Sequence, residues 1–233
     1  MKRIIVFACA FVAMTSLLGC EQLAESIATV PSFFVPETTY NGQVFQLART
    51  GTCNYTWSLN SEAAPAAIVL ETNGEKAFFK ASLPAANPNQ SKKVYITARN
   101  ADRSDISPEE NATTITPWTI GVFAYDGDKN ETLVDAQKLK VGTKYIMRFI
   151  DGSTNKPVAS VQKTATKFWT LTYEFANKNL VTAEAQDDNN KMNQIFTAKT
   201  AGSTTVSAGF IDKEDTYFQG NGYKASISIK VIN

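Results

Sequence analysis

The side chains available for chemistry exclude several enzyme classes. The chain has 233 residues and no histidine, the side chain that serves as base in Ser-His-Asp and Cys-His catalysis and is the commonest metal ligand. Carboxylates lie close together at Asp187 and Asp188. A second group is Asp212, Glu214 and Asp215. A glycosidase pair also needs a cleft, and no sequence feature indicates one. We therefore expect that the protein is not an enzyme.

One acidic segment has the spacing of a calcium-binding loop. Asp126, Asp128 and Asn130 occupy its first, third and fifth positions, where oxygen ligands are needed. An EF-hand also requires glycine at position six and glutamate at position twelve, and here these positions hold Glu131 and Gln137. We expect a solvated turn between two strands, with Ca²⁺ binding as the alternative, and no other cofactor.

A long aromatic segment is the second candidate site. Residues 212–222, DKEDTYFQGNG, give a connection of about 11 residues if they join the last two strands, whereas hairpin loops use about 2 to 5. The segment carries Tyr217 and Phe218, and Tyr223 follows it. Aromatic rings supply much contact area for little loss of entropy. The segment is therefore either a recognition loop or a packing contact between two domains.

The elements that carry these residues begin with an export signal. Lys2 and Arg3 precede an almost unbroken apolar run from Ile4 to Leu18, which is the order of a secretory signal peptide. The run has 15 residues, whereas a membrane-spanning helix needs roughly 20. We expect the segment to be cleaved rather than retained in the membrane.

The end of this run, LLGC at 17–20, resembles the lipobox of bacterial lipoproteins. The resemblance implies cleavage after Gly19, a diacylglycerol thioether on Cys20 and an acyl chain on its freed amine. Each buried methylene contributes ~0.8 kcal/mol, so several chains together hold the protein stably in the membrane. Because Glu21 rather than aspartate follows the cysteine, the resemblance implies the outer membrane, and the periplasmic and surface faces both stay open.

The remaining cysteine and the charge balance limit which kinds of partner the protein can bind. With Cys9 in the signal and Cys20 lipidated, Cys53 is the thiol that is left. We expect it to be a small buried hydrophobe, with an intermolecular disulfide as the alternative. Removing Lys2 and Arg3 from the 23 basic residues leaves 21, against 22 acidic residues. No basic patch indicates nucleic acid.

After Pro31 the pattern predicts an all-β protein. Short segments rich in Val, Ile, Thr, Phe and Tyr are separated by clusters of Gly, Asn, Asp and Pro. In the last segment, Ala225, Ile227, Ile229 and Val231 alternate with polar residues. Such alternation gives one buried and one solvated face.

The same order of segments occurs twice. In the first copy it is NGQVFQL (41–47), YTWSL (55–59), AIVLET (67–72), FFKAS (78–82) and VYITARNAD (94–102). In the second copy it is VGTKYIM (141–147), FWTLT (168–172), NLVTAE (179–184), IFTAK (195–199) and TVSAGFID (205–212). Trp57 and Trp169 occupy matching places, each 12 residues before a matching valine. Two copies of one domain explain this pattern economically.

Each copy has about seven short strands with a tryptophan on the third, as in an immunoglobulin-like sandwich, where that tryptophan fills the core. The halves resemble the bacterial immunoglobulin-like domains of invasin and intimin type surface proteins, most clearly in KVGTKY (140–145), LVTAEA (180–185) and FTAKTAGSTTVSAGF (196–210). The resemblance implies two tandem sandwiches at 31–116 and 117–233, after a signal peptide at 1–19 and a lipidated tether at 20–30.

The expected function is that of a lipid-anchored, non-enzymatic cell-envelope protein that uses immunoglobulin-like domains for binding or adhesion. Two alternatives stay open, a structural or spacer subunit of an envelope assembly and a glycan-binding accessory protein. The expected partners are the membrane, through Cys20, and a protein or glycan ligand that the sequence does not identify.

Overall fold

A computed structural model describes residues 31–49, 53–60, 66–70, 77–125, 127, 132–158, 161–164, 167–168, 170–185, 192–211 and 223–233. In this part of the chain the fold is all-β, apart from the short 3-10 helix η1 (Lys178–Leu180). The strands form two immunoglobulin-like β-sandwiches, as the sequence predicts.

The first sandwich is built from two facing sheets. Its strands are β1 (Phe33–Phe34), β2 (Thr38–Tyr40), β3 (Val44–Gln46), β4 (Ala48–Arg49), β5 (Tyr55–Leu59), β6 (Ala67–Leu70), β7 (Ala77–Lys80), β8 (Lys92–Asn100) and β9 (Glu109–Thr116). One sheet has the order β2-β9-β8-β5 and the other β3-β7-β6, while β1 and β4 form a short ribbon. Only β2 and β9 run parallel among these pairs.

The second sandwich repeats this order. Its strands are β10 (Trp118–Ala124), β11 (Leu139–Lys140), β12 (Lys144–Asp151), β13 (Lys156–Pro157), β14 (Gln162–Thr164), β15 (Lys167–Phe168), β16 (Thr170–Phe175), β17 (Val181–Ala183), β18 (Asn193–Ala198), β19 (Gly202–Ile211) and β20 (Ala225–Ile232). One sheet has the order β11-β20-β19-β16 and the other β10-β12-β18-β17. A short parallel strand, β11, again pairs with the last strand, β20.

The strand pairing confirms the correspondence between halves that the sequence repeat predicts. Strands β3, β5, β6, β7 and β8 of the first half occupy the places of β12, β16, β17, β18 and β19 in the second. The turns before β3 and β12 match in detail. The amide of Gly42 donates to the carbonyl of Ala81 (2.9 Å), and that of Gly142 donates to Ala198 (2.8 Å). Both glycines have positive φ, +91° and +78°, which the turn requires and a side chain would strain.

The hydrophobic core follows the predicted alternation. In β20, Ala225, Ile229 and Val231 are buried and Ile227 is partly buried, while the intervening side chains are exposed. In β8, Val94 and Ile96 are buried in the same alternating manner. Each fully buried aliphatic side chain contributes about 1.5–3 kcal/mol relative to an exposed one, so the alternation fixes which sheet faces meet.

Two expectations about buried side chains are wrong. Trp57 packs against the core but is only half-buried, because β5 is the end strand of its sheet in the order β2-β9-β8-β5. Its ring stacks on Tyr55 at 5.4 Å and meets Phe33 edge-on at 5.0 Å. Cys53 is partly exposed rather than buried. Trp169 lies outside the described residues.

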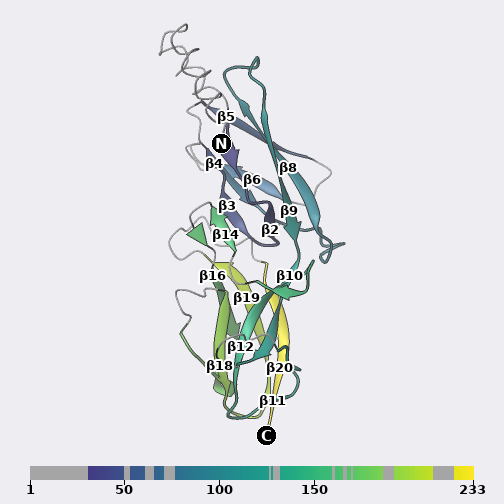
Figure 1. The fold of residues 1–233 in the computed structure, drawn as a ribbon, viewed down its shortest axis with the longest axis vertical. Helices are drawn as coiled ribbons and strands as arrows, with labels where there is room; N and C mark the ends of the chain where they lie inside the picture. The colour runs from purple at the N-terminus through teal and green to yellow at the C-terminus, as the bar shows by residue number, and fades with distance from the viewer. Residues whose placement is uncertain are drawn as a thin grey trace, which may run out of the picture.

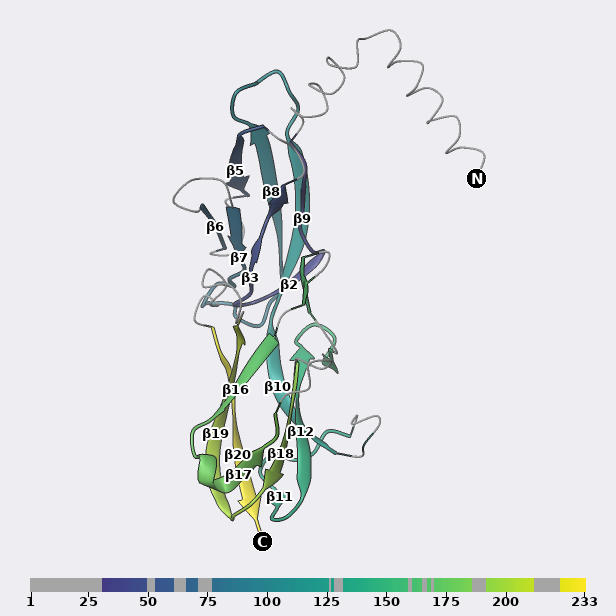
Figure 2. The same ribbon diagram turned by 90° about the vertical axis from the view of Figure 1, so that its left-hand side faces the viewer.

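The two sandwiches lie end to end along the long axis of the molecule (Figure 1). Strands β2 and β3 are at the junction end of the first sandwich, and β10, β14 and β16 are at the junction end of the second. The C-terminus is at the far end of the second sandwich, in both views (Figures 1 and 2).

Candidate functional site

Most of the residues singled out from the sequence lie outside the described part of the chain. These are Cys20, the calcium candidates Asp126, Asp128 and Asn130, and the aromatic pair Tyr217 and Phe218. Their roles stay predictions. Among the residues that the structure describes, no group of three His, Cys, Asp or Glu side chains is placed to hold a metal ion. The same residues include no helix with the length and hydropathy needed to cross a bilayer.

Tyr223 is the predicted binding residue that the structure does describe, and it lies where the two sandwiches meet. Its ring contacts the ring of Trp118 edge-on, with the centroids 5.5 Å apart. Its hydroxyl donates to the carbonyl of Trp118 at 3.4 Å. Partial burial raises the pKa of Tyr223. Tyr223 itself therefore has a packing contact at the junction, while the segment before it, residues 212–222, lies outside the described residues.

The first sandwich presents a tight turn, Tyr40 to Gln43, to the second. The amide of Gln43 donates to the carbonyl of Tyr40 (2.9 Å), and the side chain of Gln43 accepts from the amide of Tyr40 (3.0 Å). The side chain of Asn41 accepts from the amide of Leu83 at 3.1 Å. These contacts fix the turn within the first sandwich, so its shape is set by β2, β3 and the chain after β7.

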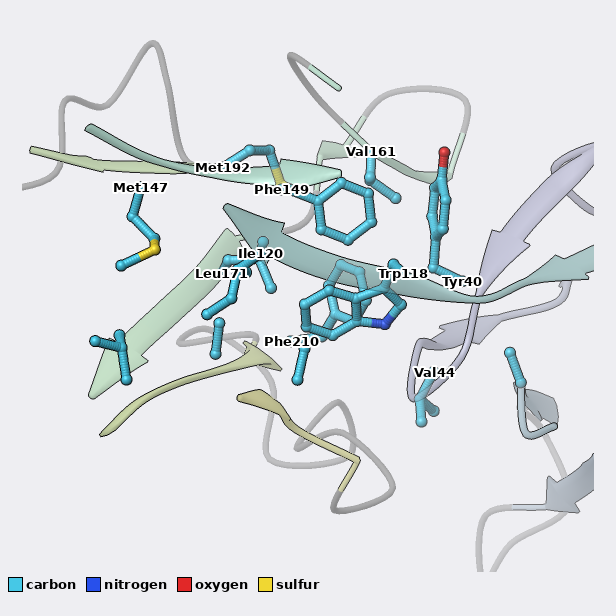
Figure 3. Close-up of a cluster of buried hydrophobic side chains, with 14 of the residues drawn as sticks. Tyr40, Val44, Trp118, Ile120, Met147, Phe149, Val161, Leu171, Met192 and Phe210 are labelled. Atoms are coloured by element: carbon cyan, nitrogen blue, oxygen red, sulfur yellow. The ribbon is translucent and has the colours of Figure 1, made fainter. Parts of the chain in front are cut away.

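Trp118, the first residue of β10, packs against this turn. Its indole N–H donates to the carbonyl of Asn41 at 2.6 Å. Its ring stacks on Phe149 of β12 at 4.9 Å and meets Phe210 of β19 edge-on at 5.2 Å. The side chain is 3% exposed. Figure 3 shows Trp118 and Phe149 together beside Tyr40, which comes from the other sandwich. The core of the second sandwich therefore extends into the junction.

Tyr40 and Asp151 form a buried hydrogen bond between the sandwiches. The Tyr40 hydroxyl donates to Asp151 Oδ2 at 2.8 Å, and its ring meets Phe149 edge-on at 4.8 Å. Asp151 Oδ1 accepts from the amides of Ser153 (2.8 Å) and Thr154 (2.9 Å), so the carboxylate also shapes its own turn. Burial, together with donation to this carboxylate, raises the pKa of Tyr40 well above its ordinary value.

The linker between the sandwiches is pinned by a close backbone contact. The amide of Gly152 donates to the carbonyl of Pro117 at 2.8 Å. A Cβ atom at position 152 would lie 2.6 Å from the Pro117 oxygen and 2.9 Å from its carbonyl carbon. Both are backbone atoms and cannot rotate away. The turn after β12 therefore fits against the linker because residue 152 has no side chain.

The ribbon of β14 and β15 closes another side of the junction. Strand β14 lies against β3 of the first sandwich (Figure 1). Val161, just before β14, is buried in the same cluster as Tyr40 and Phe149 (Figure 3). At the exposed edge of the junction, the hydroxyl groups of Ser91 and Ser153 form a hydrogen bond of 2.7 Å. The turn at Ser153 and strand β14 therefore both contact the first sandwich.

The second sandwich has a turn equivalent to Tyr40–Gln43, and comparing the exposure of the two turns shows what the junction buries. Val141 is the counterpart of Asn41, since the amides of both donate to the last strand of their own sandwich, to Ile232 and Thr116. Asn41 is 5% exposed, whereas Val141, at the far end of the molecule, is 40% exposed. The same turn is therefore covered in one sandwich and open in the other.

Sequence reasoning missed Trp118, Tyr40 and Asp151. A signal for Trp118 existed, because it follows Pro117 at the border between the two repeats. Tyr40 and Asp151 are 111 residues apart, and neither belongs to a motif. Their contact arises only when both sandwiches have folded and docked.

No protein-family model and no curated protein sequence matches the chain. Among solved structures, the chain is similar to the D00-D0 domain of intimin, at 13% identity and a TM-score of 0.29, over 88% of this chain and 100% of that one. It is also similar to domains 4 and 5 of the S-layer protein SbsC, at 10% identity and 0.26, over 77% and 71%. A third similar structure is the endo-fucoidan hydrolase MfFcnA4 from glycoside hydrolase family 107, at 13% and 0.29, over 88% and 29%. Matches this weak carry no information about the role of the chain.

Proposed function

We propose that the chain is a lipid-anchored, non-enzymatic protein of the cell envelope, in which two immunoglobulin-like sandwiches form a stiff arm that presents a binding or adhesion surface. The observation that carries the proposal is the buried junction around Trp118. Contacts between domains of one chain are commonly polar enough to allow relative motion, unless the interface is well packed and hydrophobic. Here the Tyr40 ring of the first sandwich packs edge-on against Phe149 of the second, and the Trp118 indole stacks on Phe149.

A stiff arm fits a protein that must hold a surface at a set distance from its point of attachment. Attachment through Cys20 would place the anchor before the first sandwich, and the far end of the second sandwich carries the C-terminus (Figure 1). A rigid junction between them transmits the orientation of one sandwich to the other. With a flexible linker the two sandwiches would sample many relative orientations, and that orientation would be lost.

The anchor is tested by replacing Cys20 with serine and fractionating the cells. We expect the Cys20→Ser protein to leave the membrane fraction while its circular dichroism spectrum stays that of a folded β protein, because the acyl chains are lost and the sandwiches are untouched. Cys53→Ser is the matched control and should stay in the membrane. Normal processing of Cys20→Ser together with tight membrane retention would contradict the proposal.

A structural or spacer subunit of an envelope assembly is the second candidate, because the same stiff junction suits a spacer. The two candidates differ in their partners. A spacer should co-purify with other envelope proteins in fixed stoichiometry after detergent extraction, whereas a binding protein should be recovered alone. Proteolysis of intact cells distinguishes the surface face from the periplasmic face.

A further inference from the structure

The turn that the first sandwich presents to the second contains an asparagine followed by a glycine, Asn41–Gly42. The turn needs glycine at position 42, because φ there is +91°. Glycine has no side chain to shield its backbone nitrogen, and asparagine is a chemically labile residue. The geometry of the turn therefore places a reactive pair of residues at the junction.

The reaction open to this pair is deamidation. Hydroxide takes the proton of the Gly42 amide, and the nitrogen attacks Cγ of Asn41. The new N–Cγ bond forms as the Cγ–Nδ2 bond breaks, so Nδ2 takes up a proton from water, leaves as ammonia, and a succinimide ring remains. Water then opens the ring at either carbonyl carbon and gives aspartate or isoaspartate. The reaction needs only water and hydroxide, and nothing is oxidised or reduced.

Contacts within the first sandwich engage both reacting groups. The side-chain oxygen of Asn41 accepts from the amide of Leu83 at 3.1 Å. The amide of Gly42, which is the nucleophile, donates to the carbonyl of Ala81 at 2.9 Å. Attack on Cγ therefore requires the Asn41 side chain to turn away from Leu83 and the Gly42 amide to leave Ala81.

The second sandwich adds contacts that confine Asn41 further. The indole N–H of Trp118 donates to the carbonyl oxygen of Asn41 at 2.6 Å. Burial raises the pKa of Tyr223, and a hydrogen bond from the Asn41 side chain to its hydroxyl acts in the opposite direction. Asn41 is 5% exposed, so the docked junction limits the access of hydroxide and water to this pair.

The equivalent turn at the far end of the molecule shows what undocking would expose. Val141 takes the place of Asn41 there, and the amide of Gly142 donates to Ala198 as that of Gly42 does to Ala81. Val141 is nevertheless 40% exposed. The turn therefore forms without a docked neighbour, and opening the junction would give Asn41 a comparable exposure.

We propose that Asn41–Gly42 is a site of spontaneous deamidation, which docking of the two sandwiches keeps closed and opening of the junction makes reactive. Aspartate would replace the amide that donates to Tyr223 by a carboxylate, which is costlier to bury than an amide. Isoaspartate would add a methylene group to the main chain inside the turn that Trp118 contacts. Both products oppose redocking, so the modification makes a transient opening permanent. The inference rests on the proposed stiff junction and names the chemistry that would end it.

The test is peptide mapping by mass spectrometry of the mature, anchored protein, incubated in detergent at mildly alkaline pH. The peptide ETTYNGQVFQL (37–47) is the unfolded reference. We expect Asn41 in the parent to react at least about 100-fold more slowly than in this peptide, because reaction requires local opening. Gly152→Ala should raise the rate at least about tenfold, which corresponds to about 1.4 kcal/mol of easier opening. Tyr223→Phe should raise it about two- to tenfold, the range for losing one hydrogen bond, and it keeps the test valid if Gly152→Ala folds poorly.

Gly209→Ala is the matched control. It adds the same methyl group at an ordinary contact distance of 3.4 Å, and Asn41 should react as in the parent. Peptide mapping also reads Asn41 separately from the Asn-Gly pairs at 73–74 and 221–222, which lie outside the described residues.

Two results would overturn the inference. One is a parent in which Asn41 reacts at the rate of the peptide. The other is that Gly152→Ala and Tyr223→Phe both react at the rate of the parent. Small-angle scattering of the same samples measures the stiffness of the arm separately. A parent with a narrow spread of orientations that still reacts at the peptide rate refutes the inference alone, whereas a wide spread with slow deamidation refutes the stiff arm.

Discussion

Replacing Gly152 with alanine should separate the two sandwiches. The new Cβ would stand 2.6 Å from the Pro117 carbonyl oxygen, 2.9 Å from its carbonyl carbon and 3.0 Å from its Cγ. Two of these atoms are backbone, so relief requires the linker or the turn after β12 to move. Either movement breaks the hydrogen bond from the Gly152 amide to Pro117 and displaces Asp151 from Tyr40.

The magnitude follows from two contributions. Forcing an extra methyl group into a packed site costs about 1–3 kcal/mol. Losing the hydrogen bond between Gly152 and Pro117 costs about 0.5–1.5 kcal/mol. We therefore expect a loss of about 2–4 kcal/mol of stabilisation at the junction, most of it in the coupling between sandwiches rather than within either one.

The assay combines urea denaturation with small-angle scattering. Trp57 and Trp169 also fluoresce, so the parent and both variants carry Trp57→Phe and Trp169→Phe. Fluorescence then reports on Trp118, which is buried against Phe149. In Gly152→Ala its environment should change at a lower urea concentration than in the parent, and scattering should show a wider spread of orientations between the sandwiches. The β-sheet signal in circular dichroism should remain.

Gly209→Ala is the matched control for this change. A Cβ at position 209 would meet Lys224 Cγ and the Tyr223 carbonyl oxygen at 3.4 Å, an ordinary contact distance. We expect a change within about 0.5 kcal/mol, typical of surface substitutions. If Gly152→Ala matches the parent and Gly209→Ala in both urea midpoint and scattering, the linker is not pinned at Pro117 and the reasoning for a stiff junction fails.

Two further predictions concern single side chains. Trp57→Ala should destabilise the first sandwich by about 2 kcal/mol, below the 3–5 kcal/mol for a fully buried aromatic, because Trp57 is half-buried; an unchanged urea midpoint would contradict its packing against Phe33 and Tyr55. Tyr40→Phe should cost about 1–2 kcal/mol, since the Asp151 carboxylate loses one hydrogen bond but keeps its two amide donors. Because burial raises the pKa of Tyr40, its contribution is intact below about pH 10, where unfolded tyrosine ionises, and falls as the pH rises beyond that value. The parent should therefore lose stability above about pH 10 more steeply than Tyr40→Phe, and equal slopes in alkaline denaturation curves would contradict the role of the hydroxyl.

The local alternation of apolar and polar residues determined which segments are strands and in what order they follow along the chain. The alternation of Ala225, Ile229 and Val231 fixed the buried face of β20, because a strand repeats every two residues whatever surrounds it. Gly202, within the segment 196–210 that carries the family resemblance, begins β19. Such features depend on neighbours in sequence or on one adjacent strand, so a single sequence carries them.

The sequence by itself thus determined an all-β chain of two similar sandwiches, and it located Tyr223 in a region with packing as one of its two alternatives. Only the tertiary structure decided that Trp57 is half-buried, that Trp118 fills the junction and that Tyr40 bonds to Asp151. The physical reason is that each outcome depends on which surfaces meet after folding. Whether Trp57 is covered depends on β5 being the end strand of its sheet. The bond between Tyr40 and Asp151 joins residues 111 positions apart, and no periodicity or motif connects positions that meet only when two folded sandwiches dock.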